Sequence, residues 1–392
     1  MTLRRRIGAG SLRVTSATAA GVAAMLIIAA CSSSPSSSSS SGSSASSSGS
    51  ASGSGEVSIG VDLTYNNTAF WAAYINYEAQ YAQQLHIKMI GPLLAGNDAN
   101  TQNTQIETLV NEGAKAIVVN PETATSLGPA ITYAAAHGVE LISVDTIVGV
   151  GHVYMVVRAS NLEYGLDACA LMSSQFKSGY VLDIEGDLTS SNGADRTNAF
   201  DACMAKNDPG VHILKDPTNW ITATAVTDAQ NAVNAYGSQL KGIYSQWSSP
   251  DTGIIPLLKS KGLTGKVTVV SDDGVPFEMC DISQGNLSAS QSQPANLYAY
   301  WALKYALDAA TGVKLSAGQP GGGAPSLAMV SFNGDSNLGD PIVPPFVTKA
   351  KQALNITPVD GLSGAVTTTP VSDSSLWGNV YGNAHGGVCS SS

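Results

Sequence analysis

The chain has 392 residues, 43% of them hydrophobic and 6% aromatic, and a formal net charge of −10. This length suits two ordinary globular domains better than one. Four arginines lie among the first 13 residues, so the remainder carries about −14. An acidic surface repels phosphate backbones, which argues against nucleic acid as a partner.

Residues 1–30 have the pattern of an export signal, in which basic residues precede a short apolar run. The run, residues 21–30, is shorter than the about 20 apolar residues that span a bilayer. It ends in Ile28-Ala29-Ala30-Cys31, which resembles the lipobox of bacterial lipoprotein signal peptides. The resemblance implies that Cys31 becomes the lipid attachment site. The alternatives are an ordinary cleaved signal, or a membrane anchor, with Cys31 incidental.

Residues 31–55 continue from Cys31 into a stretch that is almost entirely Ser, Gly and Ala. Such a composition cannot bury enough apolar surface to become ordered, so we interpret it as a flexible tether. A random coil of this length reaches about 25–30 Å. A lipid at one end and a folded body at the other would hold the protein at the outer face of the cytoplasmic membrane.

From residue 56 onward, short apolar runs alternate with amphipathic stretches, which predicts βαβ units and parallel sheets. The first series has predicted strands at 57–63, 86–90, 116–119 and 141–144 and helices at 70–85, 99–112 and 126–137. The second has helices at 162–176, 194–204, 223–236, 253–261 and 298–310 and strands at 179–184, 211–215, 242–245, 267–271 and 287–290. A further strand is predicted at 342–348, and residues 356–392 are assigned no element. Two such modules predict two doubly wound lobes with a cleft beyond the carboxyl ends of their strands.

Four cysteines remain once Cys31 is set aside, and an even number in an exported protein favours disulfides. Cys169, Cys203, Cys280 and Cys389 allow three pairings. We favour Cys169–Cys203 with Cys280–Cys389, because the first two would lie on neighbouring helices of one lobe. Four buried free thiols are the alternative. No Cys-x-x-Cys or His-x-x-x-His occurs, so we predict no metal site and no cofactor.

Five segments together resemble the periplasmic sugar-binding proteins of the ribose-binding type, and they occur in the order of that family. They are VSIGVDLTYNNTAFW, QIETLVNEGAKAIVVNP, AAAHGVELISVDT, GADRTNAF and VTVVSDDG. The resemblance implies the type I periplasmic binding protein fold, an α/β fold of two doubly wound parallel-sheet lobes joined by three crossovers. We place the crossovers near residues 158–160, 292 and 343–346. The N-terminal lobe is then 56–159 plus 293–341, and the C-terminal lobe and tail are 160–292 plus 342–392.

The resemblance also implies ligand-binding roles for particular side chains. Carboxylates accept hydrogen bonds from sugar hydroxyls, Arg donates, amides do both, and aromatic rings stack on the sugar. Where the family has Asn-Asp, this chain has Gln246-Trp247, and its first loop has one extra residue before Phe70. The predicted ligand-binding residues are Asn67, Phe70, Trp71, Asp145, Arg196, Trp220, Trp247, Asp273 and Gln293.

Several of these residues have structural alternatives. Asp145 could cap a following helix, and Arg196 could pair with Asp195 or Asp201 on the surface. The two tryptophans at 71 and 220 could belong to the core. Of the adjacent Asp272 and Asp273, we expect one to be solvated and prefer Asp273 as the ligand-binding residue. Gln291 competes with Gln293.

The function that follows is an extracytoplasmic receptor that captures a small polar ligand, a sugar first of all, for the permease of an ABC importer. We expect a monomer. A sensor that presents its ligand to a membrane kinase or chemoreceptor would have the same sequence features. An exported glycoside-active enzyme would need paired carboxylates; Asp183, Glu185 and Asp187 are candidates, but we interpret them as a solvated acidic edge. The long tail, with Cys389 near its end, is expected to be pinned to the body.

Overall fold

The computed structural model describes residues 55–316, 318–321, 339–359 and 363–389. The predicted export signal, Cys31 and nearly all of the predicted tether lie outside these ranges. None of the helices within them combines the length and the apolar character that crossing a bilayer requires.

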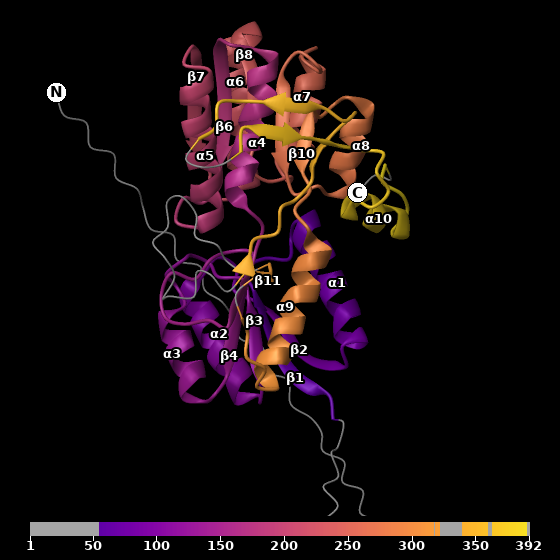
Figure 1. Cartoon of the computed structure of the whole chain (residues 1–392). Helices are drawn as coiled ribbons and strands as arrows, with labels where there is room; N and C mark the ends of the chain where they lie inside the picture. Colours follow the sequence, from indigo (N-terminus) through magenta and orange to yellow (C-terminus); the bar gives the residue numbers. More distant parts are fainter. Residues whose placement is uncertain (1–54, 317, 322–338, 360–362, 390–392) are drawn as a thin grey trace, which may run out of the picture. The chain divides into compact units, whose positions relative to one another are not determined.

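The first lobe is built on a parallel five-stranded sheet of order β2-β1-β3-β4-β5 (Figure 1). Side chains alternate along its strands, so Val118 faces one apolar layer and Ile117 the other. Helices α1 (Ala69–Gln84) and α9 (Ala295–Ala310) cover one face, and α2 (Ala99–Asn111) and α3 (Gly128–Ala136) cover the other. The strands are β1 (Val57–Leu63), β2 (Ile87–Leu94), β3 (Ala116–Val119), β4 (Glu140–Val144) and β5 (Met155–Val157).

The second lobe is built on a seven-stranded sheet of order β16-β13-β10-β9-β8-β6-β7. Five neighbouring strands of this sheet, β10, β9, β8, β6 and β7, are parallel, and β13 runs antiparallel to β10. Helices α4 (Asn161–Gln175) and α5 (Ser191–Asn207) cover one face; α6 (Thr222–Tyr236), α7 (Asp251–Ser260) and α8 (Pro276–Gln284) cover the other. The strands are β6 (Gly179–Glu185), β7 (Val211–Pro217), β8 (Leu240–Ser245), β9 (Thr268–Asp272), β10 (Ala289–Gln291), β13 (Phe346–Thr348) and β16 (Thr369–Pro370).

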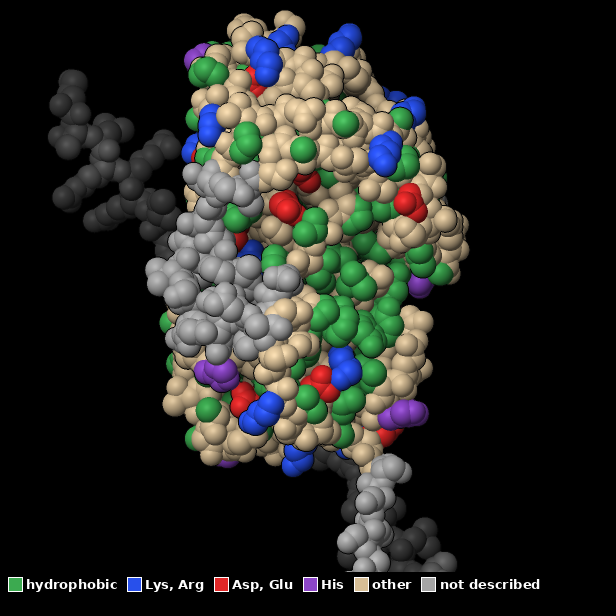
Figure 2. Space-filling view, in the orientation of Figure 1, with side chains coloured by type: hydrophobic (Ala, Val, Ile, Leu, Met, Phe, Trp, Pro, Cys, Tyr) green, Lys and Arg blue, Asp and Glu red, His purple; other side chains and the backbone are tan. Residues whose placement is uncertain are grey.

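Three segments carry the chain between the two sheets, at residues 158–160, 292–294 and 341–345. The first and third run side by side: Ile342 donates its N–H to the carbonyl of Arg158, and Ser160 donates to the carbonyl of Ile342. The predicted α/β class with two parallel-sheet lobes is confirmed. On the face drawn in Figure 2, charged side chains are scattered and hydrophobic ones gather over α9, where Leu297 is 39% exposed.

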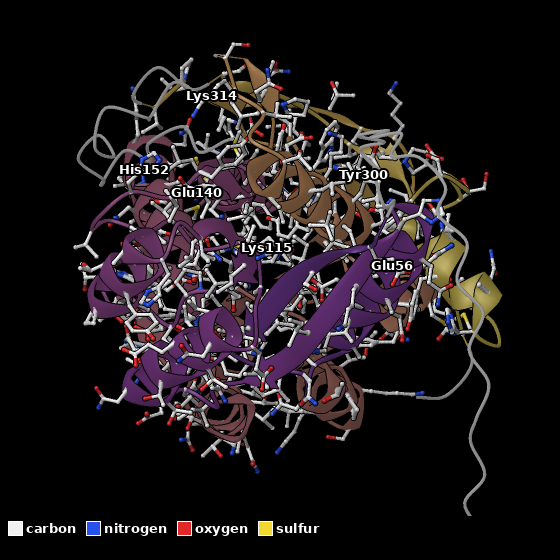
Figure 3. All side chains as sticks on the ribbon, turned by 90° about the horizontal axis from the view of Figure 1, so that it is seen from below. Glu56, Lys115, Glu140, His152, Tyr300 and Lys314 are labelled. Atoms are coloured by element: carbon white, nitrogen blue, oxygen red, sulfur yellow. A yellow bond between two sulfur atoms is a disulfide. The ribbon has the colours of Figure 1, made fainter. Side chains whose placement is uncertain are left out.

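All strands of the first sheet point the same way, so the two edges of the sheet differ in character. Glu56, Lys115 and Glu140 stand at the amino ends of β1, β3 and β4 (Figure 3). The opposite edge carries Thr64, Asn120 and Asp145, which follow the carboxyl ends of the same strands. The chain direction therefore gathers polar side chains at the edge where such folds bind ligands.

Most predicted elements occur within a few residues of their expected bounds, but several elements were missed. Helix α8 was missed because it is short and mostly polar on the solvent side. It begins with Pro276 at its first position, and Glu278 accepts a hydrogen bond from the N–H of Val275. Strand β5 has only three residues. The tail, where the sequence shows little periodicity, contributes β15 (Ala365–Thr367), which pairs with β14 (Ala353–Asn355) just before the tail, and the helix α10 (Trp377–Ala384).

Two disulfides join cysteines that the sequence analysis paired in the same way. Cys169 on α4 bonds to Cys203 on α5, and Cys280 on α8 bonds to Cys389 in the tail. Both bonds lie within the ordinary range of Cα separations, at 6.1 and 5.1 Å. The second closes a loop of sequence separation 109, which ties the end of the described chain to the second lobe.

Helices α4 and α5 approach so closely at Gly165 that a Cβ atom there would lie 2.3 Å from the carbonyl oxygen of Arg196. We therefore expect Gly165→Ala to lower the free energy of unfolding by about 1–3 kcal/mol, the usual cost of overpacking. Urea unfolding followed by circular dichroism measures this. Ser174→Ala, at an exposed position of the same helix, should change stability by less than about 0.5 kcal/mol. Equal effects of the two substitutions would contradict the close-packing argument.

Candidate functional site

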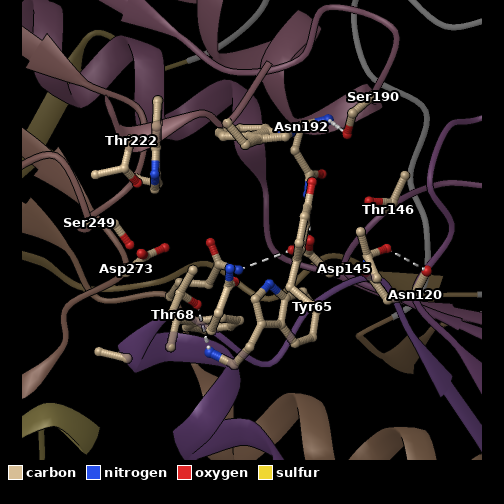
Figure 4. A pocket seen from close by; sticks show the side chains of 18 of the residues that line it. Tyr65, Thr68, Asn120, Asp145, Thr146, Ser190, Asn192, Thr222, Ser249 and Asp273 are labelled. Carbon is tan, nitrogen blue, oxygen red and sulfur yellow. Dashed lines mark hydrogen bonds between the residues drawn. The ribbon is translucent and has the colours of Figure 1, made fainter. Parts of the chain in front are cut away.

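A cavity of about 710 Å³ lies between the carboxyl ends of the two sheets. This volume is within the range of small-molecule sites. Figure 4 shows polar side chains from both lobes converging on it, with Asp145 and Asp273 on different sides. All nine predicted ligand-binding residues line this cavity: Asn67, Phe70, Trp71, Asp145, Arg196, Trp220, Trp247, Asp273 and Gln293.

Asp145 directly follows β4 and has a backbone φ of 69°, a conformation that non-glycine residues seldom adopt. The next regular element is β5, so the alternative in which Asp145 caps a following helix is wrong. One carboxylate oxygen accepts a hydrogen bond from Asn192 Nδ2 at 2.7 Å, and the other accepts from Gln293 Nε2 at 3.0 Å. Burial raises the pKa of Asp145, while the charges of Arg196 and Arg158 oppose that rise.

Asp145 and Arg196 belong to one ring of hydrogen bonds. Along one arm, Arg196 Nε donates to Asn161 (2.7 Å), Asn161 donates to Asn192 (3.0 Å), and Asn192 donates to Asp145 (2.7 Å). Along the other, Arg196 Nη2 donates to Gln293 (2.8 Å), which donates to Asp145 (3.0 Å). The ring joins the first lobe, the second lobe and the second crossover, so these five side chains orient one another.

Arg196 is buried, and its guanidinium lies against two rings and one carboxylate. It stands 4.4 Å from the centre of the Tyr164 ring and 5.8 Å from that of Trp220. Its Nη1 lies 3.5 Å from Asp272 Oδ2. Burial acts to lower the pKa of Arg196, but the carboxylate of Asp272 and neighbouring groups raise it above its usual value, so the side chain stays charged.

The surface pairings considered for Arg196 are wrong, because both candidate partners bind other cations. Asp195 accepts from Arg158 Nη2 at 2.7 Å in a fully buried pair, and Asp201 pairs with Lys215. A charge buried this deeply needs partners. Asp272 and the ring described above supply them for Arg196.

Asp273 follows β9 with a φ of 114° and lines the cavity. Its Oδ2 accepts hydrogen bonds from the N–H (2.9 Å) and the hydroxyl (2.6 Å) of Ser248. Burial raises the pKa of Asp273 to about 6, and the two bonds from Ser248 oppose the rise. The expectation that one of the two adjacent aspartates is solvated is wrong. Asp272 is fully buried and accepts from the hydroxyl of Tyr244 at 2.8 Å.

Aromatic rings line the cavity from both lobes. Phe70 and Trp71, in the first turn of α1, meet edge to face with centres 5.2 Å apart. Trp220 and Trp247 of the second lobe form a similar pair at 5.3 Å. Phe70 and Trp71 also belong to the buried core of the first lobe. These two side chains therefore belong to the core and line the cavity at the same time.

Gln293 rather than Gln291 lines the cavity; Gln291, the last residue of β10, instead donates a hydrogen bond to Asp167 at 2.6 Å. Sequence reasoning missed other lining residues, among them Asn192. Its position, four residues before Arg196, places it on the same helix face and is the signal that could have found it. The missed polar and aromatic lining residues include Tyr65, Asn120, Glu122, Ser190, Asn192, Thr222, Ser249 and Phe277.

The carboxylates considered for glycoside hydrolysis do not line the cavity. Asp183 and Glu185 are buried rather than solvated, so their interpretation as a solvated edge is wrong for these two. Asp183 accepts from Gln246 Nε2 at 3.2 Å. Within the described ranges, no group of three His, Cys, Asp or Glu residues is placed to hold a metal ion.

The family model described as "periplasmic binding protein domain" matches residues 59–314, which is more than half of the chain. The chain belongs to this family. It is a family of binding proteins rather than enzymes.

Individual relatives share less than a third of their aligned residues with the chain. The xylitol-binding protein of Mycolicibacterium smegmatis is 28% identical over 215 residues, which is 54% of this chain and 61% of that protein. The match therefore spans less than two thirds of that relative. The ribose import binding protein of Bacillus subtilis is 22% identical, over 66% of this chain and 84% of its own length.

Solved structures of binding proteins show the same fold. The myo-inositol binding protein of Caulobacter, bound to myo-inositol, superposes with a TM-score of 0.64 at 22% identity and covers 74% of this chain and 93% of its own. A solute-binding protein from Mycobacterium smegmatis with bound glycerol has a TM-score of 0.62 at 23% identity, over 67% and 90%. The fold is that of the type I periplasmic binding proteins.

The raised pKa of Asp273 leads to a prediction about pH. A hydroxyl that donates to this carboxylate stabilises its charged form, so binding releases a proton below pH 6 and affinity must increase with pH. We expect affinity to be highest above about pH 7 and to fall as the pH drops through about 6 toward 5. Calorimetric titration across this range measures the effect.

Two variants make the pH prediction specific. Asp273→Asn should make the profile less steep, because the amide does not titrate; the pKa of Glu122, another lining residue, is raised by burial to about 7, so a smaller pH dependence remains. Asp201→Asn changes an aspartate that pairs with Lys215 away from the cavity, and it should leave the profile unchanged. A wild-type affinity that is constant from pH 5 to 8 would show that Asp273 does not accept a hydrogen bond from the ligand.

Proposed function

We propose that the protein is an exported receptor that binds a small, hydroxyl-rich ligand between two lobes and delivers it to the permease of an ABC importer. Monosaccharides and the related polyols are the ligand class that we favour. In this proposal residues 56–159 and 293–341 form one lobe, and residues 160–292 and 342–392 form the other lobe and the tail. The receptor acts as a monomer and carries out no catalysis.

The observation that carries the proposal is the makeup of the cavity. It combines two buried carboxylates, a buried guanidinium and several amides with two aromatic pairs from opposite lobes. Sugar hydroxyls both donate and accept hydrogen bonds, while the C–H faces of the ring stack on aromatic side chains. The relatives named for ribose and xylitol bind molecules of this chemistry.

The three crossovers support closure of the lobes around the ligand. Opening and closing would require backbone rotation in only a few crossover residues, which is the hinge type of domain movement. A ligand that contacts both lobes binds the closed form more tightly and shifts the population toward it. The permease can then distinguish loaded from empty receptor by the arrangement of the lobes.

We expect isothermal titration against D-ribose, D-xylose, D-allose, xylitol and myo-inositol to show saturable binding of at least one of these compounds. Asp145→Asn and Arg196→Lys should weaken that binding by about 10- to 100-fold, since each leaves buried polar groups without partners at about 1–3 kcal/mol. Asp201→Asn serves as the matched control and should bind like the wild type. Absence of binding across the whole panel would rule out the proposed ligand class.

Membrane attachment through Cys31 is a separate part of the proposal. It is supported by the resemblance to a lipobox and by the Ser/Gly-rich stretch that follows. In cells grown with radiolabelled palmitate, we expect the wild-type protein to be labelled and to sediment with membranes. Cys31→Ser should be unlabelled and released, whereas Ser32→Ala should behave like the wild type. A labelled, membrane-bound Cys31→Ser protein would refute lipidation at this position.

A further inference from the structure

The tail helix α10 is fixed to the second lobe at several points. Cys389, shortly after the helix, is disulfide-bonded to Cys280 on α8. Asn379 donates hydrogen bonds to the carbonyls of Val371 and Asp373, both at 2.8 Å. The helix also lies so close to the β9–α8 loop that a Cβ on Gly378 would come within 2.2 Å of the carbonyl oxygen of Gly274. Residues 377–389 are called the strap below.

The opposite side of the strap reaches the first lobe. The ring of Trp377 meets Phe70 of α1 edge to face, with centres 6.1 Å apart, and Trp377 is only 4% exposed. One turn later, Tyr381 contacts the Tyr77 ring at 5.6 Å, and its hydroxyl accepts a hydrogen bond from Asn76 Nδ2. Figure 1 shows α10 beside α8, on the side of the molecule where α1 begins. The strap thus spans from one lobe to the other.

The contact of Trp377 matters for ligand binding because Phe70 lines the cavity. Phe70 also touches Trp71 at 5.2 Å and Tyr298 of α9 at 6.2 Å. The hydroxyl of Tyr298 accepts a hydrogen bond from the N–H of Ala159, in the first crossover, at 2.6 Å. Trp377, Phe70 and Tyr298 therefore form a row of rings that begins at the strap, includes the cavity wall at Phe70 and ends at the first crossover.

We propose that the strap holds the two lobes together and that Trp377 is a positioning residue, which sets the orientation of the cavity ring Phe70 from the opposite lobe. The proposal rests on the proposed function in that its second readout is ligand binding. Because the strap is bonded covalently to the second lobe, separating the lobes must break the Trp377–Phe70 and Tyr381–Asn76 contacts. The strap then shifts the equilibrium toward the closed form and slows ligand release.

The first test needs no ligand. Spin labels are introduced as noncanonical amino acids at Thr108 on α2 and Lys259 on α7, both exposed, so that the disulfides stay intact. Pulsed electron paramagnetic resonance then reports the distribution of distances between the lobes in the full chain. We expect Trp377→Leu and the double variant Cys280→Ser, Cys389→Ser to shift this distribution to longer distances. Val380→Ala, at a 48% exposed position of the same helix, should match the wild type.

The second test measures release of the tightest binder among ribose, xylose, allose, xylitol and myo-inositol by stopped-flow tryptophan fluorescence. We expect dissociation about tenfold faster in Trp377→Leu. Trp377→Phe retains a ring against Phe70 and should restore most of the wild-type rate. Tyr381→Phe loses only the hydrogen bond from Asn76 and should fall between the two.

The outcomes separate the strap from the receptor function. If both variants unfold at lower temperature but keep the wild-type distance distribution, the strap is a purely structural element and the proposal is wrong. Wild-type release rates in Trp377→Leu would also overturn the positioning role. Failure of every compound to bind would count against the proposed ligand class, while the distance measurement would still decide whether the strap holds the lobes together.

Discussion

The site depends on two opposite charges, those of Asp145 and Arg196, held in a buried space by amide side chains. An isolated buried charge is costly, and the cost disappears only when each polar atom has a partner. Asn161 and Asn192 along one arm and Gln293 along the other carry hydrogen bonds from the guanidinium to the carboxylate. An amide side chain both donates and accepts hydrogen bonds, so it can accept one from the guanidinium side and donate one toward the carboxylate. The residues around the cavity are thereby oriented before a ligand arrives.

The ring of hydrogen bonds also explains how two lobes contribute to one site. Asp145 comes from the end of a strand in the first lobe, Arg196 from a helix in the second, and Gln293 from a crossover. Any movement of one lobe against the other alters the Asn192–Asp145 bond, which spans the cleft. The fully buried pair of Arg158, in the first crossover, with Asp195, one residue before Arg196, ties the same helix to the hinge region.

Backbone strain is concentrated at the same place. Six described non-glycine residues have positive φ, and four of them, Asn97, Asp145, Trp220 and Asp273, line the cavity. Such conformations cost free energy and persist where the surrounding structure enforces them. Here they turn side chains at the ends of strands and loops into the cleft. For Trp220 the space is made by Gly186, where a Cβ would lie 2.1 Å from the indole ring.

By itself, the sequence determined the α/β class and the order of most strands and helices, and its resemblance to the sugar-binding family implied the nine side chains that the structure places at the cavity. The physical reason is that parallel strands with apolar alternation gather the residues after their carboxyl ends at one edge, which brings Asp145 and Asp273 toward the same space. Only the tertiary structure decided which partners these residues have. Asp272 and Asp273 are adjacent in sequence, yet Asp272 lies beside Arg196 and Asp273 faces the cavity, because the chain leaves the strand after Asp272 and the positive φ of Asp273 turns its side chain into the cleft. The strap was predicted only in part: the sequence analysis paired Cys280 with Cys389 and expected the tail to be pinned, but a helix of eight residues is easily overlooked, and its ring contacts come from distant parts of the chain.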